Sequence, residues 1–189
     1  MTDVRWPLAG VVFALASALP ATSRAQQPFA DHWFLGARGG IAVTDQNYDN
    51  DGTVWQAHVG RTFGETYAFE LELTADEYDF GLDYGLKHYG IGFNHLTINR
   101  EPLWDPYFLI GVGAIRYEAP EGQGLEFEGG TDVMFNLGVG GQWEIVLPEK
   151  MFLRADLRLR YDLNDTRQPG QNGFGDGIFT VGIVVPFAR

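Results

Sequence analysis

Alternating apolar and polar residues between positions 131 and 147 constrain the fold more than any other feature of the sequence. Every second residue of this stretch is apolar or glycine: Val133, Phe135, Leu137, Val139, Gly141, Trp143, Ile145 and Leu147. The residues between them are polar or small, apart from one methionine: Asp132, Met134, Asn136, Gly138, Gly140, Gln142 and Glu144. Successive side chains of a strand point to opposite faces, so this period predicts a β-strand with one apolar face. The run is longer than the usual strand of a globular protein.

The next segment, residues 153–163, repeats the alternation with stronger contrast. Its apolar positions are Leu153, Ala155, Leu157, Leu159, Tyr161 and Leu163. Charged residues fill the positions between them: Arg154, Asp156, Arg158, Arg160 and Asp162. A short connection that contains Pro148 separates the two segments, whereas a helix would place apolar residues three or four positions apart. The two segments therefore predict a hairpin of long strands.

Six further segments show the same period less regularly: residues 32–43, 53–63, 66–76, 86–98, 106–117 and 177–187. The connections nearly alternate between short and long, and the long ones are rich in Asp, Glu, Asn or Gly: residues 44–52, 77–85, 118–130 and 164–176. Membrane barrels have short turns on one side and long loops on the other. We therefore predict an all-β fold, an eight-stranded antiparallel up-and-down transmembrane β-barrel. Both faces of 106–117 are apolar, which leaves its register open and is compatible with a β-bulge.

A soluble barrel of the lipocalin type would show the same alternation and is the alternative. Two features favour a membrane barrel instead. Small residues on the polar face suit the crowded interior of an eight-stranded barrel: Gly90, Gly92, Gly138 and Gly140. Aromatic residues gather toward the strand ends, as the two interfacial girdles of a membrane barrel require: Trp33, Trp55, Phe63, Tyr67, Tyr89, Trp143, Tyr161, Phe179 and Phe187.

Three arginines, Arg154, Arg158 and Arg160, decide which face of their strand meets lipid. An arginine at the bilayer midplane costs about 2–4 kcal/mol, and a whole domain has a net stability of only about 5–15 kcal/mol. We therefore expect these arginines to point into the lumen, where they need charged partners. We hypothesise a lumen charge network of the following residues: Arg38, Glu70, Glu72, Asp76, Glu144, Arg154, Asp156, Arg158, Arg160 and Asp162. Filling and neutralising the core is the role we favour, and lining a gated ion path is the alternative.

The N-terminus has the pattern of a removable leader. Residues 7–20 form a short apolar run, and Ser23, Arg24 and Ala25 follow, with small side chains at the two positions that a signal peptidase recognises. We predict a cleaved signal peptide at residues 1–25 and an outer-membrane β-barrel domain at residues 26–189. A membrane anchor is the alternative, but the run is shorter than the roughly 20 apolar residues of a spanning helix.

Several kinds of chemistry are excluded by composition. The chain has no cysteine, and its serines, Ser17 and Ser23, lie in the predicted leader, which excludes hydrolases that use either nucleophile. The histidines fall on different predicted strands without ligand-type spacing: His32, His58, His88 and His95. A formal net charge of −12 argues against binding to nucleic acid. We predict no catalytic residue, no cofactor and no metal site.

The chain resembles the eight-stranded outer-membrane barrels typified by the N-terminal domain of the outer membrane protein A family and its single-domain relatives. The resemblance covers residues 28–189 and rests on the period, on a closing stretch 179–187 that looks like a barrel-assembly signal, and on four residues of the fifth segment: Pro106, Tyr107, Gly111 and Gly113. It departs from that signal because Ala188 and Arg189 follow Phe187.

This resemblance implies an exported, porin-like protein of the outer membrane of a Gram-negative bacterium. Its expected partners are outer-membrane lipid and lipopolysaccharide, together with the barrel-assembly machinery during insertion. We expect a monomer that is not an enzyme and has a structural or surface-interaction role, with acidic external loops. A narrow channel or carrier for small or apolar solutes is the first alternative, and a lipid-modifying outer-membrane enzyme is the second. Residues 95–99 resemble the histidine and serine motif of lipid A deacylases, but Thr97 stands where serine is needed.

Overall fold

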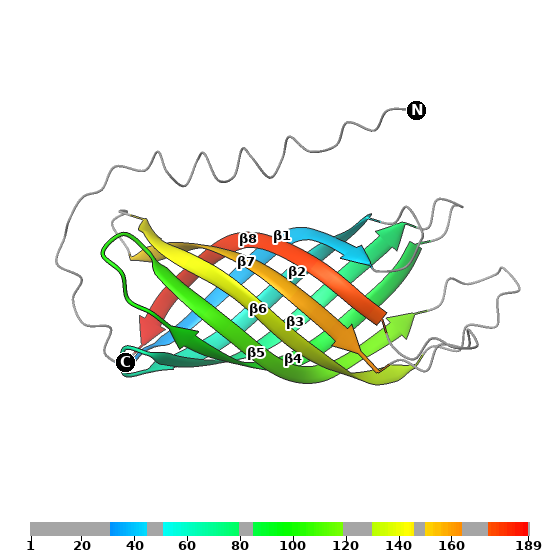
Figure 1. Ribbon diagram of the computed structural model, residues 1–189, viewed down its shortest axis with the longest axis horizontal. Coiled ribbons are helices and arrows are strands. Elements are labelled where there is room, and N and C mark those ends of the chain that lie inside the picture. Colours follow the sequence, from blue (N-terminus) through cyan, green and yellow to red (C-terminus); the bar gives the residue numbers. More distant parts are fainter. Residues whose placement is uncertain are drawn as a thin grey trace, which may run out of the picture.

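Eight strands follow one another along the chain and close into a barrel (Figure 1). The computed structural model describes residues 31–44, 51–79, 85–118, 130–145, 150–163 and 174–188, so the predicted signal peptide lies outside the described residues. The strands are β1 (Trp33–Thr44), β2 (Asp51–Phe63), β3 (Tyr67–Asp79), β4 (Gly85–Ile98), β5 (Asp105–Glu118), β6 (Thr131–Ile145), β7 (Met151–Asp162) and β8 (Phe174–Ala188). Each strand pairs antiparallel with the next, and β1 also pairs with β8. The predicted eight-stranded antiparallel up-and-down barrel is confirmed.

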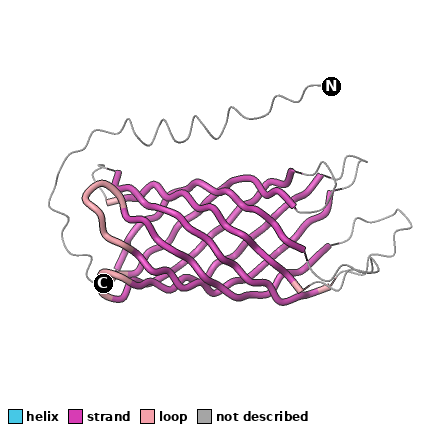
Figure 2. The backbone as a smooth tube through the Cα atoms, viewed as in Figure 1, coloured by secondary structure: helices cyan, strands magenta, loops and turns pink. Residues whose placement is uncertain are grey.

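The two ends of the barrel differ in their connections. We call one the turn end; it holds the start of β1, the end of β8 and the connections 64–66, 99–104 and 146–150. The other, the loop end, holds the connections 45–50, 80–84, 119–130 and 163–173. The turn end lies on the left in Figures 1 and 2. Its tightest connection contains Gly64, whose φ of 62° lies in the left-handed region that glycine adopts most readily.

Three strands extend further at the loop end than the side-chain pattern predicts. β2 begins at Asp51, β3 ends at Asp79 and β8 begins at Phe174, against predicted limits of 53, 76 and 177. The ladder continues there through backbone pairs such as Gly52 with Tyr78, because backbone hydrogen bonds do not depend on side-chain alternation. The connections 45–50 and 80–84 are therefore shorter than predicted, and the contrast between long and short connections is weaker.

Burial settles the register of β5, which the sequence left open. Its inward residues include four apolar side chains: Tyr107, Leu109, Ile115 and Tyr117. Its outward residues include Phe108, Ile110 and Val112, which are exposed. β5 pairs with β4 and β6 in unbroken register, so it carries no bulge against either neighbour. A register shift lies instead between Trp33 and Phe34 of β1, opposite β8.

A belt of large apolar side chains covers the outside of the strands. Leu137, Val139, Leu157 and Leu159 are between 46% and 64% exposed, although a folded core fills the inside. The aromatic residues predicted for the interfacial girdles all belong to this outer face: Trp33, Trp55, Phe63, Tyr67, Tyr89, Trp143, Tyr161, Phe179 and Phe187. Soluble monomers rarely expose a continuous apolar surface of this kind, which marks contact with another apolar phase. Within the described ranges, no helix is long and apolar enough to cross a membrane.

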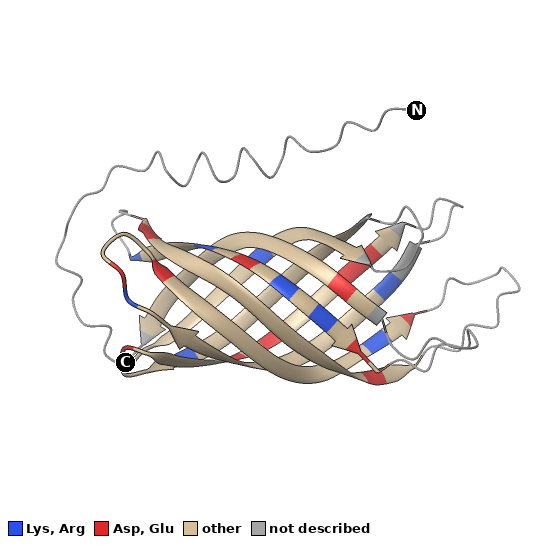
Figure 3. Ribbon diagram, viewed as in Figure 1, with Lys and Arg blue, Asp and Glu red and all other residues tan. Residues whose placement is uncertain are grey.

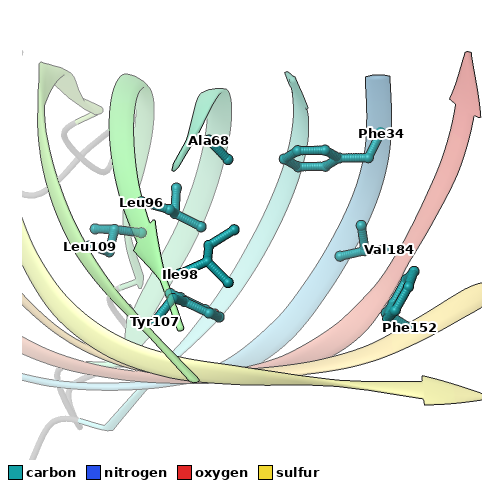
Figure 4. Close-up of a cluster of buried hydrophobic side chains, with 8 residues drawn as sticks. All are labelled: Phe34, Ala68, Leu96, Ile98, Tyr107, Leu109, Phe152 and Val184. Atoms are coloured by element: carbon teal, nitrogen blue, oxygen red, sulfur yellow. The ribbon is translucent and has the colours of Figure 1, made fainter. Parts of the chain in front are cut away.

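Inside the barrel, apolar and charged side chains form layers. The turn-end plug (Figure 4) consists of Phe34, Ala68, Leu96, Ile98, Tyr107, Leu109, Phe152 and Val184. Two loop-end clusters lie at the opposite side, the first formed by Ala42, Val54, Tyr78 and Ile178 and the second by Ile115, Tyr117 and Met134. Buried charged residues such as Arg38, Glu72 and Asp156 lie between these apolar layers. A cavity beside the plug measures ≈ 10 Å³, which is room for about one water molecule.

Candidate functional site: the charged lumen

Three strands supply most of the charged side chains of the lumen. β1 contributes Arg38, and alternate inward positions of β3 and β7 contribute the others: Glu70, Glu72, Asp76, Arg154, Asp156, Arg158, Arg160 and Asp162. All are at most 3% exposed. β3 and β7 are separated by three strands on one side and by three on the other, so their inward side chains meet across the barrel. Figure 3 shows the charged residues as coloured bands along the ribbons.

Arg38 and Arg158 share two acids in the middle of the lumen. Arg38 forms ion pairs with Glu72 and with Asp156, the latter at 2.5 Å between Nη1 and Oδ2. Arg158 donates from Nη1 to both carboxylate oxygens of Glu72, at 2.9 Å each. Its Nη2 lies 3.7 Å from Oδ1 of Asp156. Glu72 and Asp156 are thus each bridged by both arginines.

Arg154 extends this group toward the turn end. It forms an ion pair with Glu70, and its Nε lies 3.4 Å from Oδ2 of Asp156. Together with the four residues above, Arg154 and Glu70 complete what we call the central network: Arg38, Glu70, Glu72, Arg154, Asp156 and Arg158. Its guanidinium and carboxylate charges balance, which is the condition under which buried ions are tolerated.

Tyr107 of β5 joins the central network to the turn-end plug. The Nε of Arg154 donates to the Tyr107 hydroxyl at 2.7 Å, and that hydroxyl donates to Asp156. The guanidinium carbon of Arg154 also lies 4.6 Å from the centroid of the tyrosine ring. Sequence reasoning missed Tyr107 because both faces of its strand are apolar. A polar tip on an otherwise apolar inward face is the signal that would have identified it.

A second ion cluster surrounds Arg160 nearer the loop end. Arg160 pairs with Asp76 and, at 2.7 Å between Nη2 and Oδ2, with Asp176. Its Nη2 also donates to the Tyr78 hydroxyl at 2.8 Å. Asp176 and Tyr78 were absent from the prediction because the predicted strands 177–187 and 66–76 stop just short of them. Thr74 completes the cluster by donating to Asp76 at 3.0 Å.

Two of the hypothesised residues occupy other places. Asp162 is buried on the same face of β7, nearer to the loop end than the Arg160 cluster. Glu144 belongs to the alternate positions of β6 that face inward, but it lies next to the end of that strand, where its side chain is exposed. Glu144 takes part in none of the ion pairs found between described residues.

The part of the chain that the structure describes contains no cluster of metal-ligating side chains. No three His, Cys, Asp or Glu side chains are grouped there in a way that would hold a metal ion. Buried His58 and His88 have no hydrogen-bond partner on either ring nitrogen among those residues and lie beside aromatic rings. The arrangement suits compensation of charge inside a narrow barrel.

The sequence matches no family model and no curated protein. Three of the solved structures that share the fold illustrate the similarity to this chain. Neisserial surface protein A has a TM-score of 0.60 at 16% identity, over 86% of this chain and 100% of that one. The N-terminal β-barrel domain of Pseudomonas aeruginosa OprF has a TM-score of 0.53 at 15% identity, over 85% and 100%. The outer membrane enzyme PagL has a TM-score of 0.53 at 9% identity, over 82% and 99%. The chain has the fold of the small eight-stranded outer-membrane β-barrels.

Proposed function

We propose that this chain is an integral outer-membrane protein whose barrel is a closed anchor and neither a pore nor an enzyme. The filled lumen is the observation that carries the proposal, because the central network lies between the turn-end plug and the loop-end clusters. The apolar belt supports insertion into lipid, as does the fold shared with Neisserial surface protein A.

The functional surface in this proposal is the loop end. The connections 45–50, 119–130 and 163–173 are rich in Asp, Glu, Asn and Gly, and the connection 80–84 contains Gly81 and Asp83. Acidic segments in these places would bind the divalent cations that bridge lipopolysaccharide, or meet an external partner. The proposed role is therefore structural or surface interaction, by a monomer surrounded by outer-membrane lipid and lipopolysaccharide and inserted by the barrel-assembly machinery.

Cell fractionation combined with gel mobility tests this proposal. The protein should be recovered with the outer membrane, and in detergent it should migrate faster before boiling than after, because a closed barrel resists unfolding by detergent alone. Recovery in the soluble periplasm without a heat-dependent shift would overturn the proposal.

Conductance distinguishes the anchor from the narrow channel. In planar bilayers we expect the wild-type protein to stay silent, because ion pairs and apolar side chains fill the lumen along its length. Steady unit conductance of the wild type that changes in Arg158→Ala would establish an ion path through the central network instead.

The surroundings of His95 on the outer face of β4 argue against a lipid-modifying enzyme. His95 and Thr97 lie on the outer face of β4, with 3.3 Å between Nε2 and Oγ1, but His95 Nδ1 has no hydrogen-bond partner among the described residues. A catalytic histidine needs a group that orients its second nitrogen, and threonine here replaces the serine. We expect the mass spectrum of lipid A to be the same with and without expression of the protein. A loss of acyl chains upon expression would overturn this part of the proposal.

A further inference from the structure

Arg61 is a cation on the lipid-facing side of β2, two residues before the strand ends. In register it lies beside Trp33 of β1 and Phe69 of β3, which are exposed on the same outer face. Arg61 forms no ion pair with any described residue, and its Nε is buried without a hydrogen-bond partner among them. A charge that faces lipid is expensive, so this guanidinium needs an anion from outside the chain.

The other charged side chains on the outer wall have surroundings that differ from those of Arg61. Within the strands, the other described charged side chains that face outward lie near the loop end: Glu77, Lys87, Arg116 and Glu118. That group contains both signs, and Lys87 stands opposite Glu77 and Glu118 in register. Arg61 has no acidic neighbour of this kind. The nearby Asp31 carboxylate accepts instead from the Gly64 backbone N–H, at 2.7 Å.

Aromatic rings hold the guanidinium of Arg61 in place. Its central carbon lies 5.6 Å from the ring centroid of Trp33 and 5.3 Å from that of Phe63, within the range of cation–π attraction. The aromatic surface continues from Phe63 to Phe69 and on to His95, with centroid distances of 5.6 and 5.0 Å. Aromatic girdles of this kind mark the level of the lipid headgroups.

The depth of Arg61 also fits the headgroup region. At about 3.3 Å per residue, its Cα lies within about 7 Å of the strand end. The long side chain of an arginine at this depth reaches the interface while its stem stays against apolar surface. The ligand that fills the site must therefore bring its anion from the membrane side, with an apolar tail along the belt.

We propose that Arg61, flanked by Trp33 and Phe63, binds the phosphodiester of a phospholipid in the leaflet at the turn end. The planar guanidinium fork matches the geometry of phosphate oxygens, and the lipid supplies the charge that the wall lacks. The acyl chains lie against the exposed belt beside β2 and β3, where Val59 and Leu71 face outward. This inference rests on the proposed insertion into the outer membrane.

Native mass spectrometry of the full folded chain in detergent micelles, titrated with phosphatidylglycerol, tests the site. We expect Arg61→Gln to weaken retention of the lipid roughly tenfold, the effect of losing charge-assisted hydrogen bonds. Arg61→Lys should retain part of the binding, because an ammonium keeps the charge without the fork. Lys87→Gln is the matched control, since it removes one outward cation at the opposite end, and it should bind as the wild type does.

Three outcomes would overturn the site. The first is equal retention of the lipid by Arg61→Gln and the wild type, and the second is an equal loss of the lipid in Lys87→Gln. The third is displacement of the lipid by millimolar inorganic phosphate, which would make Arg61 a site for a free ion. If Arg61→Gln fails to fold, Arg61→Lys and Trp33→Leu decide, because both should retain less lipid than the wild type. A heat-dependent gel shift in each variant shows that the barrel is intact, so failure of the lipid site would leave the proposed insertion standing.

Discussion

At the scale of single residues, the lumen is governed by the compensation of charge. A buried ion is costly to desolvate, and it is stable only when partners surround it with good geometry. Glu72 illustrates this, because it accepts from Arg38 and receives two hydrogen bonds from Arg158. Losing one such acid leaves two buried cations short of a partner.

Neutralising Glu72 should therefore destabilise the protein strongly. For Glu72→Gln we expect a loss of about 3–5 kcal/mol in the free energy of unfolding, as for other buried pairs that lose one member. Urea unfolding in lipid vesicles, followed by tryptophan fluorescence, measures this. The matched control is Glu77→Gln on the same strand, whose exposed side chain should change stability by less than about 0.5 kcal/mol. Equal effects of the two changes would contradict the structural role of the central network.

Where neighbouring strands approach most closely, the available space limits the size of the side chain. A Cβ at Gly40 would overlap the carbonyl oxygen of Phe179 on the neighbouring strand, whereas at Gly177 the nearest atom, the carbonyl oxygen of Val43, is 3.7 Å away. We expect Gly40→Ala to lower stability by about 1–3 kcal/mol and Gly177→Ala to be close to neutral. The urea midpoints of the two variants provide the comparison, and coinciding midpoints would show that β1 and β8 can separate without cost.

At the scale of the strand, the sequence shows which of the two faces a side chain occupies. It does not show the position of that side chain along the barrel axis. The period of two put Arg154, Arg158 and Arg160 on one face, and the cost of an arginine near the bilayer midplane turned that face inward. Which acid each one meets depends on the stagger of β3 against β7, which accumulates over every pairing between them. Glu144 belongs to the positions that face inward but stands at the exposed end of its strand.

Residues at predicted strand limits were harder to assign. Asp176 and Tyr78 lie where the side-chain alternation fades but the backbone ladder continues. Tyr107 was missed for another reason. Both faces of its strand carry apolar residues, so the sequence does not show which face points into the lumen. Pairing with the neighbouring strands determines where a strand ends and which of its faces points inward. A single sequence contains no direct sign of this pairing.

The connection between β4 and β5 is tied to β6 by an aromatic contact. Trp104 stacks on Trp143, with ring centroids 5.5 Å apart and planes inclined by 15°. Its indole covers Gly141, where a Cβ would overlap the ring. Gly141→Val should displace Trp104, shift the tryptophan emission and reduce the near-ultraviolet circular dichroism. Val139→Leu on the same exposed face is the control. Unchanged spectra in Gly141→Val would show that the stacked pair does not depend on this glycine.

At the scale of the whole molecule, closure defines what the protein presents to its surroundings. A sheet without free edges satisfies its own backbone hydrogen bonds, so the outside presents mainly apolar side chains between the turn end and the loop end. The similarity to solved barrels is a similarity of fold, since those structures share only 9–16% sequence identity with this chain.

Orientation in the membrane follows from the two ends and can be measured by labelling. The chain lacks cysteine, so single cysteines report their surroundings without background. We expect a membrane-impermeant maleimide to label Glu118→Cys, at the loop end, on intact cells. Glu65→Cys, in the connection 64–66, should react only after the outer membrane is permeabilised, because short turns face the periplasm. Reversed reactivity would invert the proposed orientation.

The partners in the lumen are far apart along the chain, by 84 residues for Arg154 with Glu70, 86 for Arg158 with Glu72 and 118 for Arg38 with Asp156. A growing sheet that lacks any of these strands carries bare charges on the side that will become the interior. A hairpin that enters the bilayer alone is therefore unfavourable, because its charged side chains lack their partners. Closure of the barrel by pairing of β1 with β8 brings these partners together. We therefore expect assembly to be a single cooperative event, because an incomplete barrel leaves these charges without their partners.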